Sequence, residues 1–308
     1  MAVLISIASG KGGVGKSVVS TNLALLLAKR GYRTVLADMD VGGADDHILL
    51  GQLNPPLTLT DFLEKRAARM DDVALPVLLH PNLRLIAGTG DTLATANMPF
   101  AKKKRLIKHF REIAADVAII DIGAGTSYHA LDFFLMADVH VAVATPEPTS
   151  VLDLYRFVKL AAIRRVLACF LARSPMADAL SARDFISVDD VMKLAGETDP
   201  EGRTIAAAAL ESFKPGLIVN RTTGRSQVNV HHLRNLLRQY VGGDLQVLGN
   251  IPDDPAVPQA VRRFLPVVET APDSPAAQGL AIIGEELSRM IVQVATHPTT
   301  RPALLHAD

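Results

Sequence analysis

Short apolar runs alternate along most of the chain with longer segments of helical periodicity. The runs typical of buried strands are 3–8, 34–38, 83–87, 116–121, 139–144, 216–219 and 245–248, with a further edge strand at 265–268. The helical patterns between them cover 18–30, 59–69, 100–113, 228–240, 257–263 and 275–295. Strands that alternate with helices predict an α/β fold, doubly wound, in which helices cover both faces of a mostly parallel sheet.

The segment 163–214 departs from this alternation. It carries helical patterns at 164–173, 188–194 and 204–212, separated by loop signals, and it is too apolar for a disordered linker. We therefore predict a single domain over 1–308 with a helical insertion at 163–214, and a flexible tail at 296–308.

A glycine-rich stretch with two lysines follows the first predicted strand. Residues 9–17 read SGKGGVGKS, which satisfies G-x-x-x-x-G-K-[ST] between a strand and a helix. Backbone N–H groups of such a loop cradle phosphates at a helix N-terminus, while Lys16 would reach the terminal phosphates and Ser17 would ligate Mg²⁺. The residues predicted to bind nucleotide here are Gly10, Lys11, Gly12, Gly13, Val14, Gly15, Lys16, Ser17 and Val18.

Aspartates end two of the predicted strands. Asp38 and Asp40 follow the apolar run at 34–38, and Asp121 ends the run at 116–121. The carboxyl ends of parallel strands share one edge of a sheet, so these carboxylates are expected near the phosphate loop. For Asp38 and Asp40 the alternative is the capping of a turn after a strand.

Composition restricts the possible functions. Of the 308 residues 49% are hydrophobic, and the 32 basic and 32 acidic side chains balance, so no overall field favours nucleic acid or an anionic membrane. The single cysteine, Cys169, excludes an intramolecular disulfide and argues against an iron–sulfur cluster. No uncharged apolar run reaches about 18 residues and the first strand lacks the basic start of a signal peptide, so we expect a cytoplasmic protein.

The loop sequence GKGGVGKS resembles the deviant Walker A signature of the MinD/ParA class of ATPases. The resemblance implies a P-loop NTPase fold, ATP and Mg²⁺ as cofactors, and a homodimer that closes on ATP with Lys11 reaching the partner's phosphates. A solvated charge on the loop rim is the alternative for Lys11. The resemblance further implies catalytic roles for Lys11, Lys16 and Asp40, where Asp40 orients water, and metal ligation by Ser17, Asp40 and Asp121.

Two segments narrow the resemblance to one branch of this class. Residues 121–125 read DIGAG, with Gly123 where most MinD and ParA proteins have proline, and residues 145–150 read TPEPTS; both are closer to the FlhG or FleN branch. In the resembled family the base lies against an asparagine and a G-x-I-P-x-D loop, which implies adenine contacts by Asn220, Pro252 and Asp253. A loop asparagine without a ligand is the alternative for Asn220.

The resemblance implies an ATP hydrolase that acts as a slow dimerisation switch in positioning or number regulation of a flagellar or division-type structure, with an activating protein partner. The alternative is a ParA-like partition or cargo-positioning ATPase that holds nonspecific nucleoid DNA through the basic run at 102–109; a solvated helix face also explains this run. A ligase of the cobyrinic-acid synthase group is a third hypothesis. The tail at 296–308 has two prolines and one arginine, so contact with the inner membrane would be peripheral at most.

Overall fold

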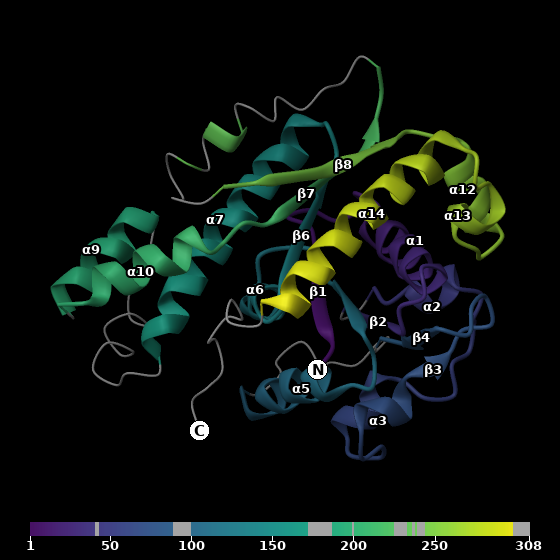
Figure 1. Ribbon diagram of the computed structural model, residues 1–308, viewed down its shortest axis with the longest axis horizontal. Helices are drawn as coiled ribbons and strands as arrows, with labels where there is room; N and C mark the ends of the chain where they lie inside the picture. The colour runs from purple at the N-terminus through teal and green to yellow at the C-terminus, as the bar shows by residue number, and fades with distance from the viewer. Residues whose placement is uncertain are drawn as a thin grey trace.

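The computed structural model describes residues 1–40, 43–88, 100–171, 187–198, 200–224, 233–235, 238 and 244–297. Within this part of the chain, one eight-stranded sheet has the order β3-β4-β2-β5-β1-β6-β7-β8 (Figure 1). The strands are β1 Val3–Ala8, β2 Thr34–Met39, β3 Leu75–Pro76, β4 Leu83–Ile86, β5 Val117–Ile122, β6 Val139–Ala144, β7 Gly216–Thr222 and β8 Gln246–Pro252. Every neighbouring pair is parallel except β3 with β4, which confirms the predicted fold class.

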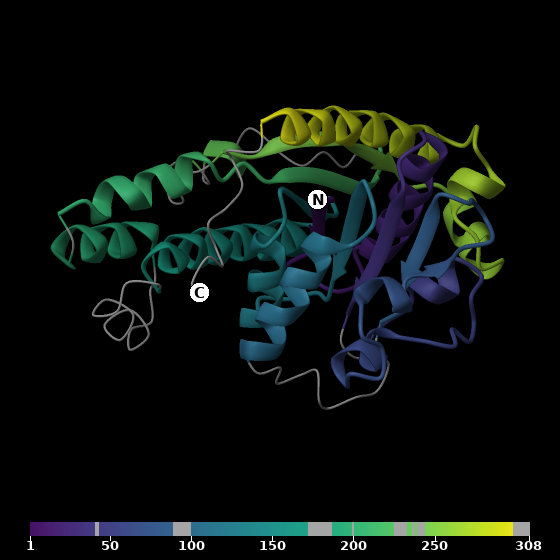
Figure 2. The same ribbon diagram turned by 60° about the horizontal axis from the view of Figure 1, so that its bottom comes forward.

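Helices cover both faces of this sheet. They are α1 Lys16–Lys29, α2 Asp46–Leu49, α3 Leu59–Leu63, α5 Phe100–Glu112, α6 Tyr128–Leu135, α7 Pro148–Leu171, α9 Val188–Thr198, α10 Gly202–Glu211, α12 Ala256–Arg262, α13 Val267–Thr270 and α14 Pro275–Thr296, with a 3₁₀ turn at Met70–Val73. The yellow helix α14 lies on one side of the sheet and α7 on the other (Figure 2).

The central strands are buried on both faces because each face has its own apolar core. In β1, Leu4 packs into the core shared with α5, α6 and α7, whereas its neighbour Ile5 packs into the core shared with α1 and α14. All six residues of β1, β2, β5 and β6 are buried, which explains why these strands are continuous apolar runs in the sequence.

Side-chain oxygens fix the helix starts at the carboxyl edge of β8. Ser274 caps α14 by accepting a hydrogen bond from the Ala277 N–H, and Pro275 occupies the first turn. The carboxylate of Asp254 accepts one bond from the Ala256 N–H at 2.8 Å and another from the Ala276 N–H at 3.0 Å. The loop after β8 is therefore held rigidly next to α12 and α14.

Three helices form an arm that extends from the sheet (Figure 1, left). α7 continues without a break to Leu171, and α9 and α10 pack on it and on each other. Arg165 connects α7 to the end of α10. Its Nε donates a hydrogen bond to the Ala209 carbonyl at 2.8 Å, and its Nη2 donates one to Ser212 Oγ at 2.9 Å. The interpretation of 163–214 as an insertion into the family fold stays a prediction.

The predicted edge strand at 265–268 is wrong. Residues 267–270 form the short helix α13, in which the Thr270 N–H donates to the Pro266 carbonyl at 3.2 Å. Pro266 has no N–H for a strand ladder, and Val267 and Val268 gain burial by packing toward α1 and α14 instead. Most of the predicted helix at 228–240, and the predicted tail from residue 298 onward, lie outside the described residues.

Candidate functional site

The phosphate-loop sequence forms a solvent-facing turn between β1 and α1. Residues 11–13 are exposed, and α1 begins at Lys16 directly after Gly15. At Gly10 the loop passes so close to α7 that a Cβ would lie 2.2 Å from the Asp153 carbonyl oxygen. The loop and the start of α7 are thus packed as one unit, with the amino end of α1 pointing into the loop.

Lys16 lies at the base of this loop and is only 6% exposed. Its Nζ donates to Asp121 Oδ2 at 2.8 Å and lies 3.9 Å from Asp40 Oδ2. Burial disfavours the charged lysine, but the charge and hydrogen bond of Asp121 outweigh it and raise the pKa of Lys16. The structure therefore brings together three residues that the sequence placed at one sheet edge.

Asp121 is completely buried at the end of β5. Besides Lys16 it has a second donor, Ser20 Oγ, at 2.6 Å from Oδ1. Ser20 lies one helical turn beyond Lys16, and the sequence analysis did not identify it. The β2–β5 register sets Asp38 directly beside Asp121, so two buried carboxylates share one face of the sheet.

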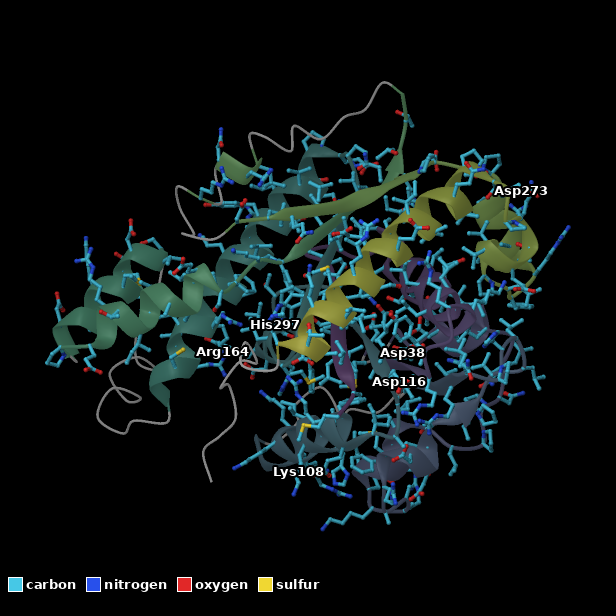
Figure 3. The ribbon with its side chains drawn as sticks, in the orientation of Figure 1. Asp38, Lys108, Asp116, Arg164, Asp273 and His297 are labelled. Atoms are coloured by element: carbon cyan, nitrogen blue, oxygen red, sulfur yellow. The ribbon has the colours of Figure 1, made fainter. Side chains whose placement is uncertain are left out.

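Asp38 organises the loop that follows β2. Its Oδ1 accepts from the Asp40 N–H at 2.9 Å and its Oδ2 from the Asp46 N–H at 3.2 Å. Burial and the nearby charge of Asp121 raise the pKa of Asp38 to about 7. The turn-capping alternative thus describes these two hydrogen bonds of Asp38. The residue is only 1% exposed, and Figure 3 labels it near the middle of the view.

Asp40 is more accessible, with 28% of its side chain exposed. Burial and the charge of Asp121 raise the pKa of Asp40, although Lys16 opposes this. The loop after β5 passes close by, because a Cβ on Gly123 would lie 2.9 Å from Asp40 Oδ1. A side chain at position 123 would therefore compete with Asp40 for space.

A third buried carboxylate, Asp46, joins Asp38 and Asp121, and the sequence analysis did not foresee it. Asp46 is the first residue of α2 and is fully buried. Ligand atoms of Asp38, Asp46 and Asp121 all lie within 4.8 Å of one another. Burial, followed by the charges of Asp121 and Asp38, raises the pKa of Asp46 well above its ordinary value.

A cleft of about 980 Å³ opens beside the phosphate loop, between α1, β7 and α12. Five predicted residues line it: Gly15, Val18, Asn220, Pro252 and Asp253. Arg221 and Arg262 also line it, although no sequence motif indicated them. The volume suits a small-molecule ligand of nucleotide size.

The amide of Asn220 is engaged at both ends by backbone groups. Its Nδ2 donates to the Val14 carbonyl at 2.8 Å, and its Oδ1 accepts from the Arg221 N–H at 3.0 Å. Asn220 thus connects β7 to the phosphate loop, and its contact with a base stays a prediction.

Lys11 lies on the exposed rim of the loop. Its Nζ donates to Thr149 Oγ1 at 3.2 Å, at the start of α7. Leu152, one turn further along α7, is 49% exposed, which is high for a large apolar side chain. Lys11 and the first turns of α7 therefore form one continuous outer surface.

The basic run on α5 is partly used inside the protein. Lys103 is buried and pairs with Asp132, and the guanidinium of Arg105 lies 4.5 Å from the ring centre of Phe62. Lys108, which Figure 3 shows at the periphery, has Glu112 4.0 Å away. These contacts agree with a structural and solvated helix face.

A glycine-rich loop between β1 and α1, with a lysine and strand-end carboxylates at its base, defines a P-loop nucleotide-binding α/β protein. Residues 5–267 match the family model described as the CobQ/CobB/MinD/ParA nucleotide binding domain. The chain belongs to this family.

Curated relatives support the narrower resemblance to FlhG and FleN. The chain is 37% identical over 160 residues to the antiactivator FleN of Pseudomonas aeruginosa, covering 51% of this chain and 55% of FleN. It is 31% identical over 163 residues to the flagellum site-determining protein YlxH of Helicobacter pylori, covering 51% and 52%. The matched region thus spans about half the length of these two relatives.

Solved structures confirm the fold. MinD of Pyrococcus horikoshii, complexed with Mg-ADP, superposes with a TM-score of 0.65 at 21% identity, covering 94% of this chain and 97% of that one. A ParA family ATPase of Chlorobium tepidum gives a TM-score of 0.62 at 17% identity, covering 93% and 98%. In the described part of the chain no helix is both long and apolar enough to span a bilayer.

Proposed function

We propose that the protein binds and slowly hydrolyses ATP as a dimerisation switch in positioning, or in number regulation, of a flagellar or division-type structure. The observation that carries the proposal is the convergence of Lys16, Asp40 and Asp121 at the base of the loop, with Lys11 on its rim. The names of the relatives, FleN, YlxH and the septum site-determining MinD of Chlorella vulgaris, support the process. An activating partner would be a protein that binds the ATP-bound form.

The donor set fits Mg²⁺, because carboxylate and hydroxyl oxygens are its preferred protein ligands. Ser17, Asp40 and Asp121 would hold the ion, which when bound neutralises charge on the phosphates. Lys16 would exchange Asp121 for the terminal phosphates, and the partly exposed carboxylate of Asp40 would accept a hydrogen bond from the attacking water. Catalysis then depends on positioning and electrostatics.

The outer surface around Lys11 supports closure with a second copy. Thr149 and Leu152 are exposed beside Lys11, and the contact of Gly10 with Asp153 keeps the loop and α7 in fixed relation. A second copy that buries Leu152 would bring each Lys11 to the partner's nucleotide.

The test is the molar mass in solution, by light scattering after gel filtration, with ATP and Mg²⁺ or with ADP. We expect the wild type and Asp40→Ala to dimerise with ATP only. Lys11→Ala should bind a fluorescent ATP analogue within about threefold of the wild type yet stay monomeric. Lys16→Gln should lose at least about 100-fold in affinity, because a charged phosphate contact is removed.

Lys29→Gln is the matched control, since Lys29 is an exposed lysine of α1 that pairs with Glu269 outside the site. It should behave as the wild type. A wild-type chain that binds ATP and remains monomeric, or a Lys11→Ala variant that dimerises normally, would overturn the switch proposal.

A further inference from the structure

Three buried carboxylates meet beneath the phosphate-loop lysine. Asp38 comes from the end of β2, Asp121 from the end of β5, and Asp46 from the start of α2; none is more than 1% exposed. One ligand oxygen from each lies within 4.8 Å of the others. We call these three residues the aspartate triad.

Asp46 differs from its two neighbours in its hydrogen bonding. Asp38 accepts two backbone N–H groups, and Asp121 accepts bonds from Lys16 and Ser20. Both carboxylate oxygens of Asp46 are buried and have no hydrogen-bond partner among the described residues. A buried, charged carboxylate without a partner is strongly disfavoured, so Asp46 is neutralised either by a proton or by a cation bound at this point.

The described side chains do not supply that cation. Lys16 Nζ donates a hydrogen bond to Asp121 Oδ2 and makes none to Asp46. The same Nζ lies 3.9 Å from Asp40 Oδ2 and 3.5 Å from Ser17 Oγ. One positive charge thus faces the aspartate triad together with Asp40. A cation bound at 2.0–2.6 Å by each oxygen allows ligand oxygens up to about 5 Å apart, which covers the observed spacing.

We propose that the aspartate triad binds a divalent cation in the nucleotide-free protein. This site differs from the magnesium site of the proposed function, because it needs neither Ser17 nor a phosphate oxygen and gains Asp46 as a ligand. Its occupancy would neutralise Asp121 and release Lys16 for an incoming phosphate. The inference stands whether or not the chain hydrolyses ATP.

The experiment titrates Mn²⁺ into nucleotide-free, metal-stripped protein and follows free Mn²⁺ by electron paramagnetic resonance. We expect one Mn²⁺ per wild-type chain and at least tenfold weaker binding to Asp46→Asn, which keeps the shape of the side chain. Asp45→Asn is the matched control, because Asp45 is the exposed neighbour outside the triad. Ser17→Ala should also keep its Mn²⁺, which separates this site from a nucleotide-linked one.

Thermal unfolding gives a second readout that does not depend on activity. In excess Mn²⁺ the wild type should melt several degrees higher than in EDTA, whereas Asp46→Asn should show little change. In EDTA the variant should be at least as stable as the wild type, because it removes an unpartnered buried carboxylate. A wild type that binds no Mn²⁺ without nucleotide, or an Asp46→Asn variant that binds it equally well, would overturn the proposal.

Discussion

Two buried clusters of charged side chains in this protein differ in their balance of cations and carboxylates. Between α5, α6 and α7, the single carboxylate of Asp132 accepts hydrogen bonds from both Lys103 and Arg164. Burial acts against the charge of Asp132, but Arg164 and Lys103 more than compensate and lower its pKa. This cluster is fully paired, and it fastens three helices to one another.

At the phosphate loop the ratio of cations to carboxylates is reversed. Lys16 is the cation bound there, and the carboxylates include Asp38, whose pKa is raised to about 7, and Asp46, whose pKa is also raised. The difference teaches that burial alone does not mark a functional cluster. The cluster at the phosphate loop differs in that its carboxylates outnumber its described cations, which raises their pKa values as at many functional sites.

The largest expected effect comes from breaking the paired cluster. Asp132→Ala leaves Lys103 and Arg164 as partly or fully buried cations without their shared carboxylate, and should lower the free energy of unfolding by about 3 kcal/mol. Urea denaturation at pH 7 measures it.

Asp153→Ala, which removes an exposed helical pair with Arg156, is the control and should cost no more than about 0.5 kcal/mol. If Asp132→Ala cost no more than this control, the description of the paired cluster would be wrong. If Asp46→Asn in EDTA raised the free energy of unfolding while Asp132→Ala lowered it, the contrast between the two clusters would be sharper.

A smaller effect tests a buried titratable group, His140, beside which the described residues place no acidic side chain. His140 lies between the rings of Phe134 and Phe213, and burial followed by the positive charge of Arg165 lowers its pKa to about 3. The unfolded chain, with an ordinary histidine pKa of about 6.5, takes up the proton first as the pH falls. Stability is therefore full above about pH 6.5 and is lost between there and pH 3.

Between pH 7 and pH 5 this loss amounts to about 2 kcal/mol in the wild type. His140→Phe keeps the ring packing and should remove that share of the pH dependence, as urea denaturation at both pH values would show. Equal pH slopes for wild type and His140→Phe would contradict the neutral buried histidine.

The smallest expected effect concerns the surface of α5. Lys102 and Lys108 are exposed, so the double alanine variant should change the free energy of unfolding by less than about 0.5 kcal/mol. Whether this surface binds DNA is measured by retention of the protein on nonspecific DNA in ATP and Mg²⁺. A salt-sensitive retention of the wild type that the double variant loses would favour the DNA-partition alternative over our proposed function.

Much of the site could be predicted because its signals are local. Gly10 to Ser17 is one continuous segment that contains Lys16, and Asp40 and Asp121 lie at the carboxyl ends of β2 and β5. The order of buried strands and helices then brings those ends to one edge by general rules of parallel sheets. In the structure the side chains of Lys16, Asp40 and Asp121 lie close together, and their roles at the site stay predictions.

Other features had no local signal. Asp46 lies between the polar residues Asp45 and His47, and no motif marks its carboxylate as part of the site. Arg221 and Arg262 reach the cleft from segments about forty residues apart. The resemblance predicts that Asn220 contacts the base, but it does not predict its two backbone hydrogen bonds, which depend on how closely β7 approaches the phosphate loop.

The sequence alone determined the sheet, the phosphate loop and the strand-end carboxylates, because hydrophobic period and loop chemistry act over a few neighbouring residues. Only the tertiary structure decided that Asp46 joins Asp38 and Asp121, and that Asp132 finds two cations. Charge balance in a buried cluster is a sum over segments distant in the chain, so it exists only once the chain has folded.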